Sequence, residues 1–355
     1  MTTYKQAGVD IEMGDKCSGI AYAAAKMTFS ARKGMIGEPV NLEDGFTGML
    51  DFGDFYLVQN SDGVGSKIMI AEMCQKFDML GYDLLAMVAD DAICVGAETI
   101  SINNTIDTNK VSDVVVTPLM EGLKKACLEQ KIVIPGGEIG EMPDLVKGNI
   151  WNSSAVGIVE KDKFLSAKDV KPGDPIIALR SRGFRSNGFA LVRKVLQDRF
   201  GKQWHEEKFD SERTWGEAVL TPSLIYSAAL LEILGRFKQP RLAVIKALAH
   251  VTGGGIPGNI VRVLGKYGAH LHDVWEPHGP MLKLQEYGDI PDREAYEVWN
   301  MGTGMFVISS EFEKIRDLLS PHGIEARIAG EVTEESGVRL VSKGFFEKGK
   351  ELRFE

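Results

Sequence analysis

The chain has 355 residues, of which 44% are hydrophobic and 26% charged, and its formal net charge is -9 at pH 7. This length exceeds the usual size of one hydrophobic core, so two domains are expected, and the composition is that of a folded soluble protein. The acidic charge argues against nucleic acid as the main partner, because binding to its backbone needs concentrated Lys and Arg, but a small anionic substrate remains compatible with it.

The N-terminal stretch MTTYKQAGVDIEMGDK has no apolar core of the signal-peptide type, and no run of residues is long enough to span a bilayer. The four cysteines are scattered and form no C-x-x-C pair, so neither a zinc site nor a disulfide framework is indicated. We therefore expect buried free thiols, a cytoplasmic location and no association with a membrane.

The first half of the chain alternates apolar strand-like runs with segments of helical periodicity. The predicted elements are a strand over 55–60, a helix over 79–95, a strand over 99–107, a helix over 114–128, and strands over 131–138 and 153–160. A polar stretch over 161–175 follows and contains the turn signal Lys-Pro-Gly-Asp. We place the domain boundary there, which gives domains of residues 1–165 and 170–355.

The second half again mixes the two kinds of element. The predictions are a strand over 176–181, a helix capped by Ser186 and Asn187, helices near 223–237, 243–249 and 256–264, a strand over 302–309, a helix over 311–319 and a strand over 325–332. The fold class is therefore α/β (α+β) in two domains, with glycine-rich strand ends that can line one cleft.

The stretch SDGVGSK, Ser61 to Lys67, follows the first strand and has two interpretations. After a strand, Ser-Asp-Gly is most often a plain turn. Alternatively, its glycines let backbone amides approach phosphate oxygens while Asp62 binds a divalent cation. The stretch differs from the usual triphosphate loop, in which Ser or Thr follows the lysine, because here Ser66 precedes Lys67.

Two further stretches contain pairs of acids. Asp90 and Asp91 lie in ADDAICVGAE, and Glu138 and Glu141 lie in GGEIGEMP. Adjacent acids on a helix and acids in loops usually face water. The neighbours of the aspartate pair are apolar, however, and carboxylates near an apolar surface need partners, of which Mg²⁺ is a suitable one.

The stretch HVTGGGIPGN, His250 to Asn259, contains G-x-G-x-x-G at Gly253, Gly255 and Gly258. The dinucleotide fingerprint requires a preceding strand, whereas the preceding VIKALAH is predicted as helix, so the match is weak. A glycine-rich turn that feeds a helix N-terminus is still a good anion site. His250 by itself is more often structural than catalytic.

Seven stretches, taken in order, resemble the phosphoribosylformylglycinamidine cyclo-ligase (AIR synthetase) family. They are YKQAGVD, SDGVGSK, the DD…GAE stretch, GGEIGEMP, RSNGFALVRK, LTPSLIY and HVTGGG, and the resemblance covers the chain from Tyr4 to about the strand at Glu325. The resemblance implies the ATP-dependent cyclisation of formylglycinamidine ribonucleotide to aminoimidazole ribonucleotide in purine biosynthesis, with release of ADP and phosphate. It also implies an N-terminal mixed-sheet domain that forms a β-barrel shared by a homodimer, and a C-terminal α/β domain over a long cleft.

The resemblance further implies roles for individual residues. Asp62 and Asp91 are the expected Mg²⁺ ligands, with Glu138 and Glu141 as additional ligands or polarising carboxylates. Contacts to the ATP phosphates are expected from Gly63, Gly65 and Lys67, and Lys33 is expected to close over the nucleotide. The phosphorylated substrate or the transferring phosphoryl group is expected at Ser186, Asn187, Thr252, Gly253, Gly254 and Gly255. His250 is a candidate proton carrier or charge stabiliser, and with Asp62, Lys67 and Asp91 it forms the expected catalytic set.

Several stretches depart from the family pattern, including an altered glycine-rich stretch, LEDGFTGML, over 42–50, a longer insert around 202–214, and two residue pairs. An Asn-Asp pair is usual where this chain has Asp90-Asp91, and a Pro-His pair commonly precedes Ser-Asn-Gly where this chain has Phe184-Arg185. We expect the extra acid to change the charge of the metal site and Arg185 to replace a histidine contact to phosphate. These changes bear on substrate detail more than on the fold or the use of ATP.

Two alternatives remain open. One is another ATP-using enzyme of the same superfamily, such as selenophosphate synthetase, thiamine-phosphate kinase or a hydrogenase-maturation protein. Cys17 lies within the stretch that matches the cyclo-ligase, and the chain ends ELRFE without the C-terminal cysteine of the maturation protein. The other alternative is a non-catalytic nucleotide-binding scaffold, which the retained acids and His250 disfavour.

Overall fold

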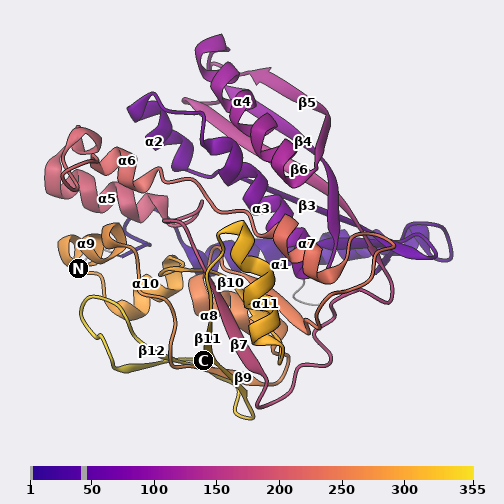
Figure 1. Ribbon diagram of the computed structural model, residues 1–355. Helices are drawn as coiled ribbons and strands as arrows, with labels where there is room; N and C mark the ends of the chain where they lie inside the picture. Colours follow the sequence, from indigo (N-terminus) through magenta and orange to yellow (C-terminus); the bar gives the residue numbers. More distant parts are fainter. Residues whose placement is uncertain (1–2, 41–45) are drawn as a thin grey trace.

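The computed structural model describes residues 3–40 and 46–355 (Figure 1). Its N-terminal half is built on a six-stranded sheet in the order β1-β2-β3-β6-β4-β5, in which only β4 and β5 run parallel. The strands are β1 (Glu38–Val40), β2 (Gly48–Asp51), β3 (Phe55–Gly63), β4 (Glu98–Thr108), β5 (Val133–Glu141) and β6 (Asn149–Glu160).

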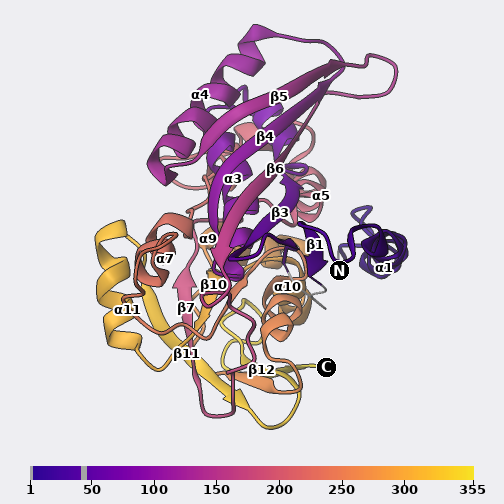
Figure 2. The same cartoon turned by 90° about the vertical axis from the view of Figure 1, so that its right-hand side faces the viewer.

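Helices cover one face of this sheet. They are α2 (Lys67–Cys74), α3 (Leu80–Cys94) and α4 (Asp113–Gln130), and Figure 2 shows α3 and α4 lying along the sheet. Side chains on β4 alternate, so that Ile102 and Ile106 are buried beneath the helices whereas Asn103 and Thr105 are exposed on the opposite face. This period of two is the pattern from which the strand was predicted.

The strand and helix predictions for this half are confirmed, but two glycine-rich stretches are strand rather than turn. Strand β3 continues through Ser61, Asp62 and Gly63, and Asp62 pairs with Ser153 of β6. Likewise β5 continues through GGEIGE to Glu141 beside β4. Pairing with a neighbouring strand satisfies the backbone of both stretches, and the chain turns only after Gly63.

The C-terminal half is built on a seven-stranded sheet in the order β13-β12-β9-β11-β7-β10-β8, in which β9 and β12 form the parallel pair. The strands are β7 (Pro175–Arg180), β8 (Ala247–His250), β9 (Gly268–Leu271), β10 (Thr303–Ile308), β11 (Ala326–Thr333), β12 (Gly337–Val341) and β13 (Glu351–Phe354). Residues 161–174 connect the last strand of the first sheet to β7.

Helices cover both faces of the second sheet. They are α5 (Phe189–Phe200), α6 (Trp215–Val219), α7 (Ser227–Leu234), α8 (Gly255–Ile260), α9 (Gly279–Gly288), α10 (Asp292–Val298) and α11 (Phe312–Leu319), with short 3-10 segments η2 (Trp204–Glu206), η3 (Val261–Val263) and η4 (Ser320–His322). Ile176 and Ala178 of β7 point into the core on the α5 and α8 side, while Ile177 and Leu179 point towards α7 and α11. A strand buried on both faces reads as a continuous apolar run, as IIAL does.

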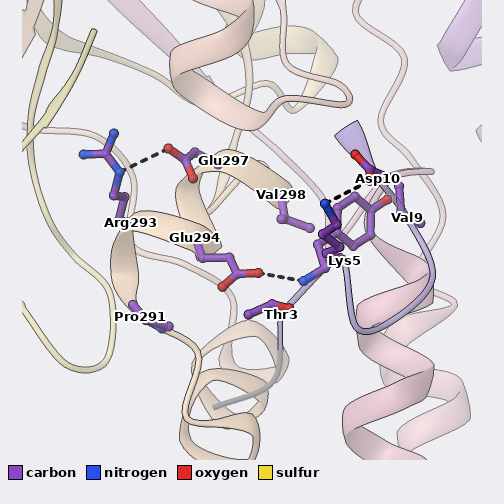
Figure 3. Close-up of a pocket in the computed structure, with 10 residues that line it drawn as sticks. Thr3, Lys5, Val9, Asp10, Pro291, Arg293, Glu294, Glu297 and Val298 are labelled. Carbon is purple, nitrogen blue, oxygen red and sulfur yellow. Dashed lines mark hydrogen bonds and ion pairs between the residues drawn. The ribbon is translucent and has the colours of Figure 1, made fainter. Parts of the chain in front are cut away.

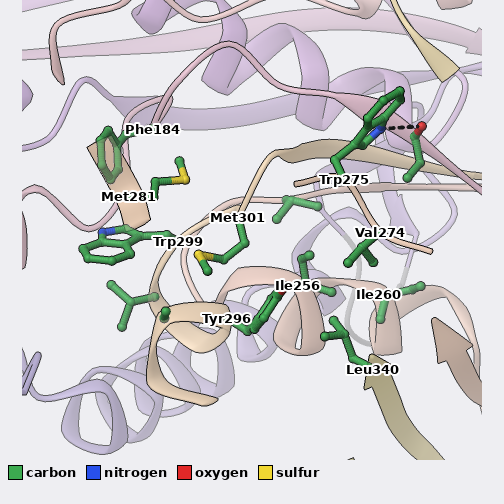
Figure 4. Packing of buried hydrophobic residues seen from close by; sticks show 14 of the residues in the cluster. Phe184, Ile256, Ile260, Val274, Trp275, Met281, Tyr296, Trp299, Met301 and Leu340 are labelled. Atoms are coloured by element: carbon green, nitrogen blue, oxygen red, sulfur yellow. Dashed lines mark hydrogen bonds between the residues drawn. The ribbon is translucent and has the colours of Figure 1, made fainter. Parts of the chain in front are cut away.

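Aromatic packing beneath residues 184–188 fixes the loop that carries Ser186 and Asn187 (Figure 4). The rings of Phe184 and Trp299 meet edge to face, with centroids 5.5 Å apart. A Cβ on Gly188 would lie 2.4 Å from the Trp299 ring, and Gly188 has φ 76°, so glycine is required there. Gly188 also occupies the N-cap of α5, so the prediction that Ser186 and Asn187 cap this helix is wrong.

The predicted helix over 243–249 is also wrong, because its end forms strand β8. A short apolar run such as VIKALAH fits either a buried helix or a buried strand, and pairing with β10 decides the outcome. The glycine turn therefore does follow a strand. Its fingerprint still does not define a dinucleotide site, because β8 is an edge strand with an antiparallel neighbour rather than part of a parallel β-α-β unit.

The N-terminal helix α1 (Ile11–Met27) and the 3-10 segment η1 (Phe29–Arg32) precede the first sheet, and Figure 2 shows α1 at the edge of the molecule. Cys94 and Cys127 are buried as expected, whereas Cys17 on α1 is exposed because little packs against this helix. In the part of the chain that the structure describes, none of the helices combines the length and apolarity needed to cross a membrane.

Candidate functional site

Helix α3 joins the two halves of the protein through two buried aspartates. Asp83 and Asp90 are seven residues apart, which places them two turns apart on the same side of the helix. Asp83 accepts hydrogen bonds from the backbone N–H and the hydroxyl of Ser223. Asp90 accepts the backbone N–H groups of Tyr226 and Ser227 at 2.9 and 3.0 Å. The LTPSLIY stretch is thus fastened along α3 by charge-assisted hydrogen bonds.

A chain of polar contacts then leads from Asp90 to Asp91. Arg185 Nη2 lies 2.7 Å from Asp90 Oδ2 and 2.7 Å from His250 Nε2. The other ring nitrogen, His250 Nδ1, lies 2.7 Å from Asp91 Oδ1. The Arg185, Asp90 and His250 side chains are almost completely buried, whereas 17% of the Asp91 side chain is exposed. Asp91 is therefore the end of this chain of contacts that reaches solvent.

Asp62 lies close to Asp91. Burial raises the pKa of Asp62 to about 6, and the nearby charge of Asp91 contributes to the rise. Burial also raises the pKa of Asp91 to about 7, although the charges of Arg262 and Arg185 act in the opposite direction. Carboxylates whose charges act on one another in this way are suited to a site that holds a cation.

Asp91 borders a pocket of about 720 Å³, together with Asn60 and Ser61 of β3. The pocket lies between α1, η1, β2, β3 and the exposed end of Asp91. The lining residues are Ser18, Gly19, Tyr22, Thr28, Phe29, Arg32, Pro39, Val40, Phe46, Thr47, Gly48, Met49, Leu50, Gln59, Asn60, Ser61 and Asp91. Two buried polar atoms, Thr47 Oγ1 and Asn60 Oδ1, have no hydrogen-bond partner in the protein. Unsatisfied buried polar atoms in a pocket indicate a ligand or ordered water.

Two arginines supply positive charge at this pocket. Arg32 of η1 lines it directly, and its guanidinium donates to the Ile36 carbonyl. Arg262 of η3 stacks over the ring of Phe46 at 3.8 Å and lies close enough to lower the pKa of Asp91. A pocket that combines carboxylates, guanidinium groups and aromatic rings suits a nucleotide, whose phosphates, cation and base need these three kinds of partner.

A second group of predicted residues gathers beside the contact chain. A Cβ on Gly65 would lie 3.4 Å from the Ser186 carbonyl, and a Cβ on Gly253 would lie 3.6 Å from Asn187 Nδ2. The structure thus brings the glycine turn after β3, the Ser-Asn-Gly loop and the TGGG turn together. Ser186 Oγ and Asn187 Oδ1 are buried and unpartnered, which again marks a place for a polar ligand.

The TGGG turn itself is held by one side chain. Asn259 Nδ2 donates to the carbonyls of Thr252, Gly253 and Gly255 at 3.4, 3.0 and 2.7 Å. Gly254 and Gly255 have φ values of 86° and 60°, and a Cβ on Gly255 would lie 1.9 Å from the Tyr296 carbonyl. Glycine is therefore needed for the shape of the turn, which keeps Gly253 beside Asn187.

The site fits magnesium through few protein ligands. In residues 3–40 and 46–355 no group of three or more His, Cys, Asp or Glu side chains is placed to hold a metal ion. Asp62, Asp91 and the unpartnered Asn60 Oδ1 nevertheless offer hard oxygen donors. Because Mg²⁺ commonly binds one or two carboxylates together with substrate phosphates, these residues suit Mg²⁺ bound jointly with a nucleotide.

Lys67 does not take part in this arrangement. Its side chain is fully buried, and its ammonium lies 2.8 Å from Asp83 Oδ1 and 2.8 Å from the Thr221 carbonyl. The expectation that Lys67 contacts ATP phosphates is therefore corrected to a structural role between α2, α3 and the 221–227 segment. Gly63 is likewise occupied, since its N–H donates to Asp62 and a Cβ there would lie 2.1 Å from Asn152 Oδ1.

Glu138 and Glu141 lie too far from Asp62 to share a metal ion with it in one chain. Asp62 of β3 is paired with Ser153 of β6, Ser153 with Asn104 of β4, and Asn104 with Gly137 of β5. Asp62 is therefore separated from β5 by three strand spacings of about 4.8 Å each. Glu138 is paired with the exposed Thr105 on the face away from α3, and Glu141 accepts the Val111 N–H. Within one chain they are therefore not ligands beside Asp62, and their role as polarising carboxylates stays a prediction.

Three further expected residues have other surroundings than the sequence indicated. His250 has both ring nitrogens engaged, and burial lowers its pKa to about 3, which favours a neutral imidazole between Arg185 and Asp91. Lys33 is exposed and does not line the pocket, where the neighbouring Arg32 is found. Arg185 is buried against Asp90, so it does not reach phosphate, and its charge compensates the extra acid.

Sequence reasoning did not identify Arg32, Thr47, Asn60 or Arg262. Asn60 was included in the predicted strand, and its position two residues before Asp62 was a signal that both side chains share one face. Arg262 lies in η3, directly after the short helix α8, which follows the glycine-rich turn. No local pattern marked Arg32 or Thr47, because their relation to Asp91 arises only from folding.

A different pocket of about 410 Å³ lies where the N-terminal segment meets α10 (Figure 3). The Tyr4 backbone N–H donates to Glu294 at 2.6 Å, and Lys5 pairs with Asp10 at 3.0 Å. Figure 3 shows Arg293 and Glu297 on the far side of this pocket. None of the predicted site residues lines it, so the YKQAGVD stretch has a docking role in this structure.

Comparisons with known proteins agree with this two-part architecture. Residues 47–159 match the model of the AIR synthase related protein N-terminal domain, and residues 171–343 match that of the C-terminal domain. A hydrogenase maturation protein HypE solved in complex with ATP superposes with a TM-score of 0.59 at 15% identity, over 89% of this chain and 86% of that chain. The fold is thus that of a two-domain AIR-synthase-related protein.

The curated relatives are more specific. The phosphoribosylformylglycinamidine cyclo-ligase of Pyrococcus furiosus is 37% identical over 97% of this chain and 99% of its own length. The enzyme of the same name from Methanocaldococcus jannaschii is 36% identical over 97% of this chain and 96% of its own length. The chain therefore belongs to the phosphoribosylformylglycinamidine cyclo-ligase family.

Proposed function

We propose that this protein catalyses the ATP-dependent cyclisation of formylglycinamidine ribonucleotide to aminoimidazole ribonucleotide, with release of ADP and phosphate. Full-length similarity to cyclo-ligases supports the reaction. The observation that carries it in the structure is Asp91, which lines a pocket with unpartnered polar atoms and whose charge acts on the nearby Asp62. A nucleotide-sized pocket with a cation site is what phosphoryl transfer requires.

The chemistry proceeds in two stages. An amide oxygen is a poor leaving group, so ATP first phosphorylates the formyl oxygen of the substrate, and a nitrogen of the same molecule then attacks that carbon and closes the five-membered ring. Catalysis of this kind depends on positioning the two substrates and neutralising phosphate charge. A bound Mg²⁺ supplies charge neutralisation for the phosphates.

In this proposal, two groups of residues bind the two substrates. Asp62, Asp91 and Asn60 hold the cation at the end of α3, and Arg32 and Arg262 face the nucleotide from η1 and η3. On the other side of the contact chain, Ser186 and Asn187 donate to or accept from the phosphorylated substrate beside the TGGG turn. Their buried and unpartnered atoms favour this assignment over a purely structural one.

We further propose that the protein acts as a homodimer in the cytoplasm, joined through the open face of the N-terminal sheet. This face carries Ile150, which is 46% exposed, next to the small polar residues Asn152 and Ser154. Sheets with one uncovered face often bury it against another element. Sedimentation velocity is expected to give a dimer for the native chain and a folded monomer for Ile150→Asp, and a native monomer would contradict the proposal.

The reaction is tested by incubating the purified protein with ATP, Mg²⁺ and formylglycinamidine ribonucleotide. ADP is expected only when all three are present, together with a stoichiometric amount of aminoimidazole ribonucleotide. ADP release without the ribonucleotide would favour a different ATP-using member of the superfamily. No ADP release at all, from protein shown to be folded, would favour the non-catalytic alternative.

A further inference from the structure

Asp90 and Arg185, which stand where the family resemblance implies Asn and His, are in direct contact. Asp90 Oδ2 and Arg185 Nη2 are 2.7 Å apart, and both side chains are buried. The extra negative charge of Asp90 is therefore matched by the positive charge of Arg185. A buried pair of this kind is costly to desolvate, so its retention calls for a role beyond stability.

The geometry around His250 shows what the arginine does. A guanidinium has only N–H groups and no acceptor, so Arg185 Nη2 donates to His250 Nε2 across 2.7 Å. Nε2 must then be unprotonated. The single ring proton of the neutral imidazole is left on Nδ1, which faces Asp91 Oδ1 at 2.7 Å and donates to it.

The remaining contacts hold the arginine itself in place. Its Nη1 donates to the Leu224 carbonyl at 2.8 Å, and its guanidinium lies over the Tyr226 ring at 5.1 Å. Asp90 Oδ1 is occupied by two backbone N–H groups of the same segment, so its other oxygen points at Arg185. Both terminal nitrogens of the guanidinium are thus engaged, and only the buried Nε lacks a hydrogen-bond partner.

We propose that Arg185 is a positioning residue that sets the tautomer of His250 and, through it, the orientation of the Asp91 carboxylate at the pocket. Arg185 does not touch the substrate. It leaves Asp91 Oδ1 bound to Nδ1–H and Asp91 Oδ2 free for the cation and nucleotide. The catalytic part of the proposal rests on the proposed function, whereas the tautomer itself does not. Comparable partners behind metal-binding side chains change affinity or activity by about 10–100-fold when removed.

The test begins with the native protein. Long-range ¹⁵N–¹H NMR of histidine-labelled protein at neutral pH, with the His250 signals assigned by their loss in His250→Asn, is expected to show a single neutral tautomer protonated at Nδ1. A tautomer protonated at Nε2, or a charged ring, would overturn the proposal without any activity measurement.

The double substitution D90N/R185M then removes the pair together. The amide introduced at position 90 keeps an oxygen for the Tyr226 and Ser227 N–H groups, and no buried charge is left unpaired, so the variant is expected to fold. His250 is expected to show a mixture of tautomers, and kcat is expected to fall about tenfold with KM for ATP within about twofold. Retention of the single Nδ1–H tautomer in this variant would refute the role of Arg185.

The chain provides a matched control in its other buried pair. K67M/D83N also removes a buried ion pair, here between α2 and α3 beside the 221–227 segment, and the amide oxygen introduced at position 83 can still accept from Ser223. Its His250 spectrum is expected to match the native one. An equal change in the control would assign the effect to general loosening of the domain contact. If no variant or native sample cyclised the substrate, the proposed function would fail while the tautomer result stood independently.

Discussion

Asp91 of α3 and His250 of β8 meet through a 2.7 Å contact between Oδ1 and Nδ1, which joins the two halves of the protein at the edge of the pocket. The two residues are 159 positions apart in the chain. His250 holds Asp91 Oδ1, and the Asp91 charge acts on Asp62, so the orientation of the Asp91 carboxylate depends on how the C-terminal sheet docks against α3. A movement between the two halves of the protein would therefore change the orientation of the Asp91 carboxylate at the cation site.

Asp91→Asn and Asp62→Asn are expected to lower substrate-dependent ADP release by about 100-fold or more, because each removes a charged oxygen donor from a site whose metal contributes several kcal/mol. The coupled assay for ADP measures this, and circular dichroism checks the fold. Asp198→Asn, on the exposed surface of α5, serves as the control and should retain native turnover. Near-native rates for both site variants would remove these acids from the cation site.

Arg32 and Lys33 form a natural test of the pocket, because they are adjacent and carry the same charge but only Arg32 lines it. Arg32→Met is expected to raise KM for ATP about tenfold, the equivalent of about 1.4 kcal/mol of binding free energy. Lys33→Met is the matched control and should change KM for ATP less than twofold. The reverse ranking would restore Lys33 as the residue that closes over the nucleotide.

Lys67→Met is expected to lower the free energy of unfolding by about 3–5 kcal/mol, because it leaves the Asp83 carboxylate buried without its partner. Urea denaturation followed by tryptophan fluorescence measures the change. The double variant K67M/D83N should recover most of the loss, since both charges are then absent. A stable Lys67→Met protein with a strongly raised KM for ATP would instead support the original assignment of Lys67 to the phosphates.

The stability of the protein at acid pH depends in part on Glu217, which belongs to the N-terminal cap of helix α6. A hydrogen bond from Lys76 and the Thr214 N–H lower the pKa of Glu217 from 4.5 to about 2. A depressed acid pKa means that the folded protein favours the carboxylate, so this stabilisation is present above pH 4.5 and is lost as the pH falls towards 2. The urea midpoint of the native protein should fall between pH 5 and about pH 3, and that of Glu217→Gln should fall less over the same range.

The exposed Glu206, which lies outside this cap, provides the comparison for that experiment. Glu206→Gln should leave the pH dependence of the urea midpoint close to native. An unchanged pH profile in Glu217→Gln would show that the capping box and the Lys76 pair contribute nothing measurable in solution, as is common for exposed ion pairs.

Much of the fold could be predicted from local pattern. The alternation in TISINNTID and the helical spacing around Leu84 and Val88 reflect one buried face each, and both elements formed as predicted. The failures share a cause. GGEIGE pairs with β4, and the end of VIKALAH pairs with β10. Both stretches are strands because of these pairings. A pairing partner that is distant in the chain cannot be recognised from a short window of residues.

The sequence by itself determined the family, most of the central elements of each half and the presence of Asp62, Asp91, Ser186 and the TGGG turn, because these follow from residue type and spacing along the chain. Only the tertiary structure decided which of the charged groups remain available for a ligand. Lys67 and Arg185 look equally suited to phosphate in the sequence, but both are buried against aspartates of α3. The physical reason is that a charge removed from water must find an opposite charge, and the identity of that partner depends on how distant segments pack.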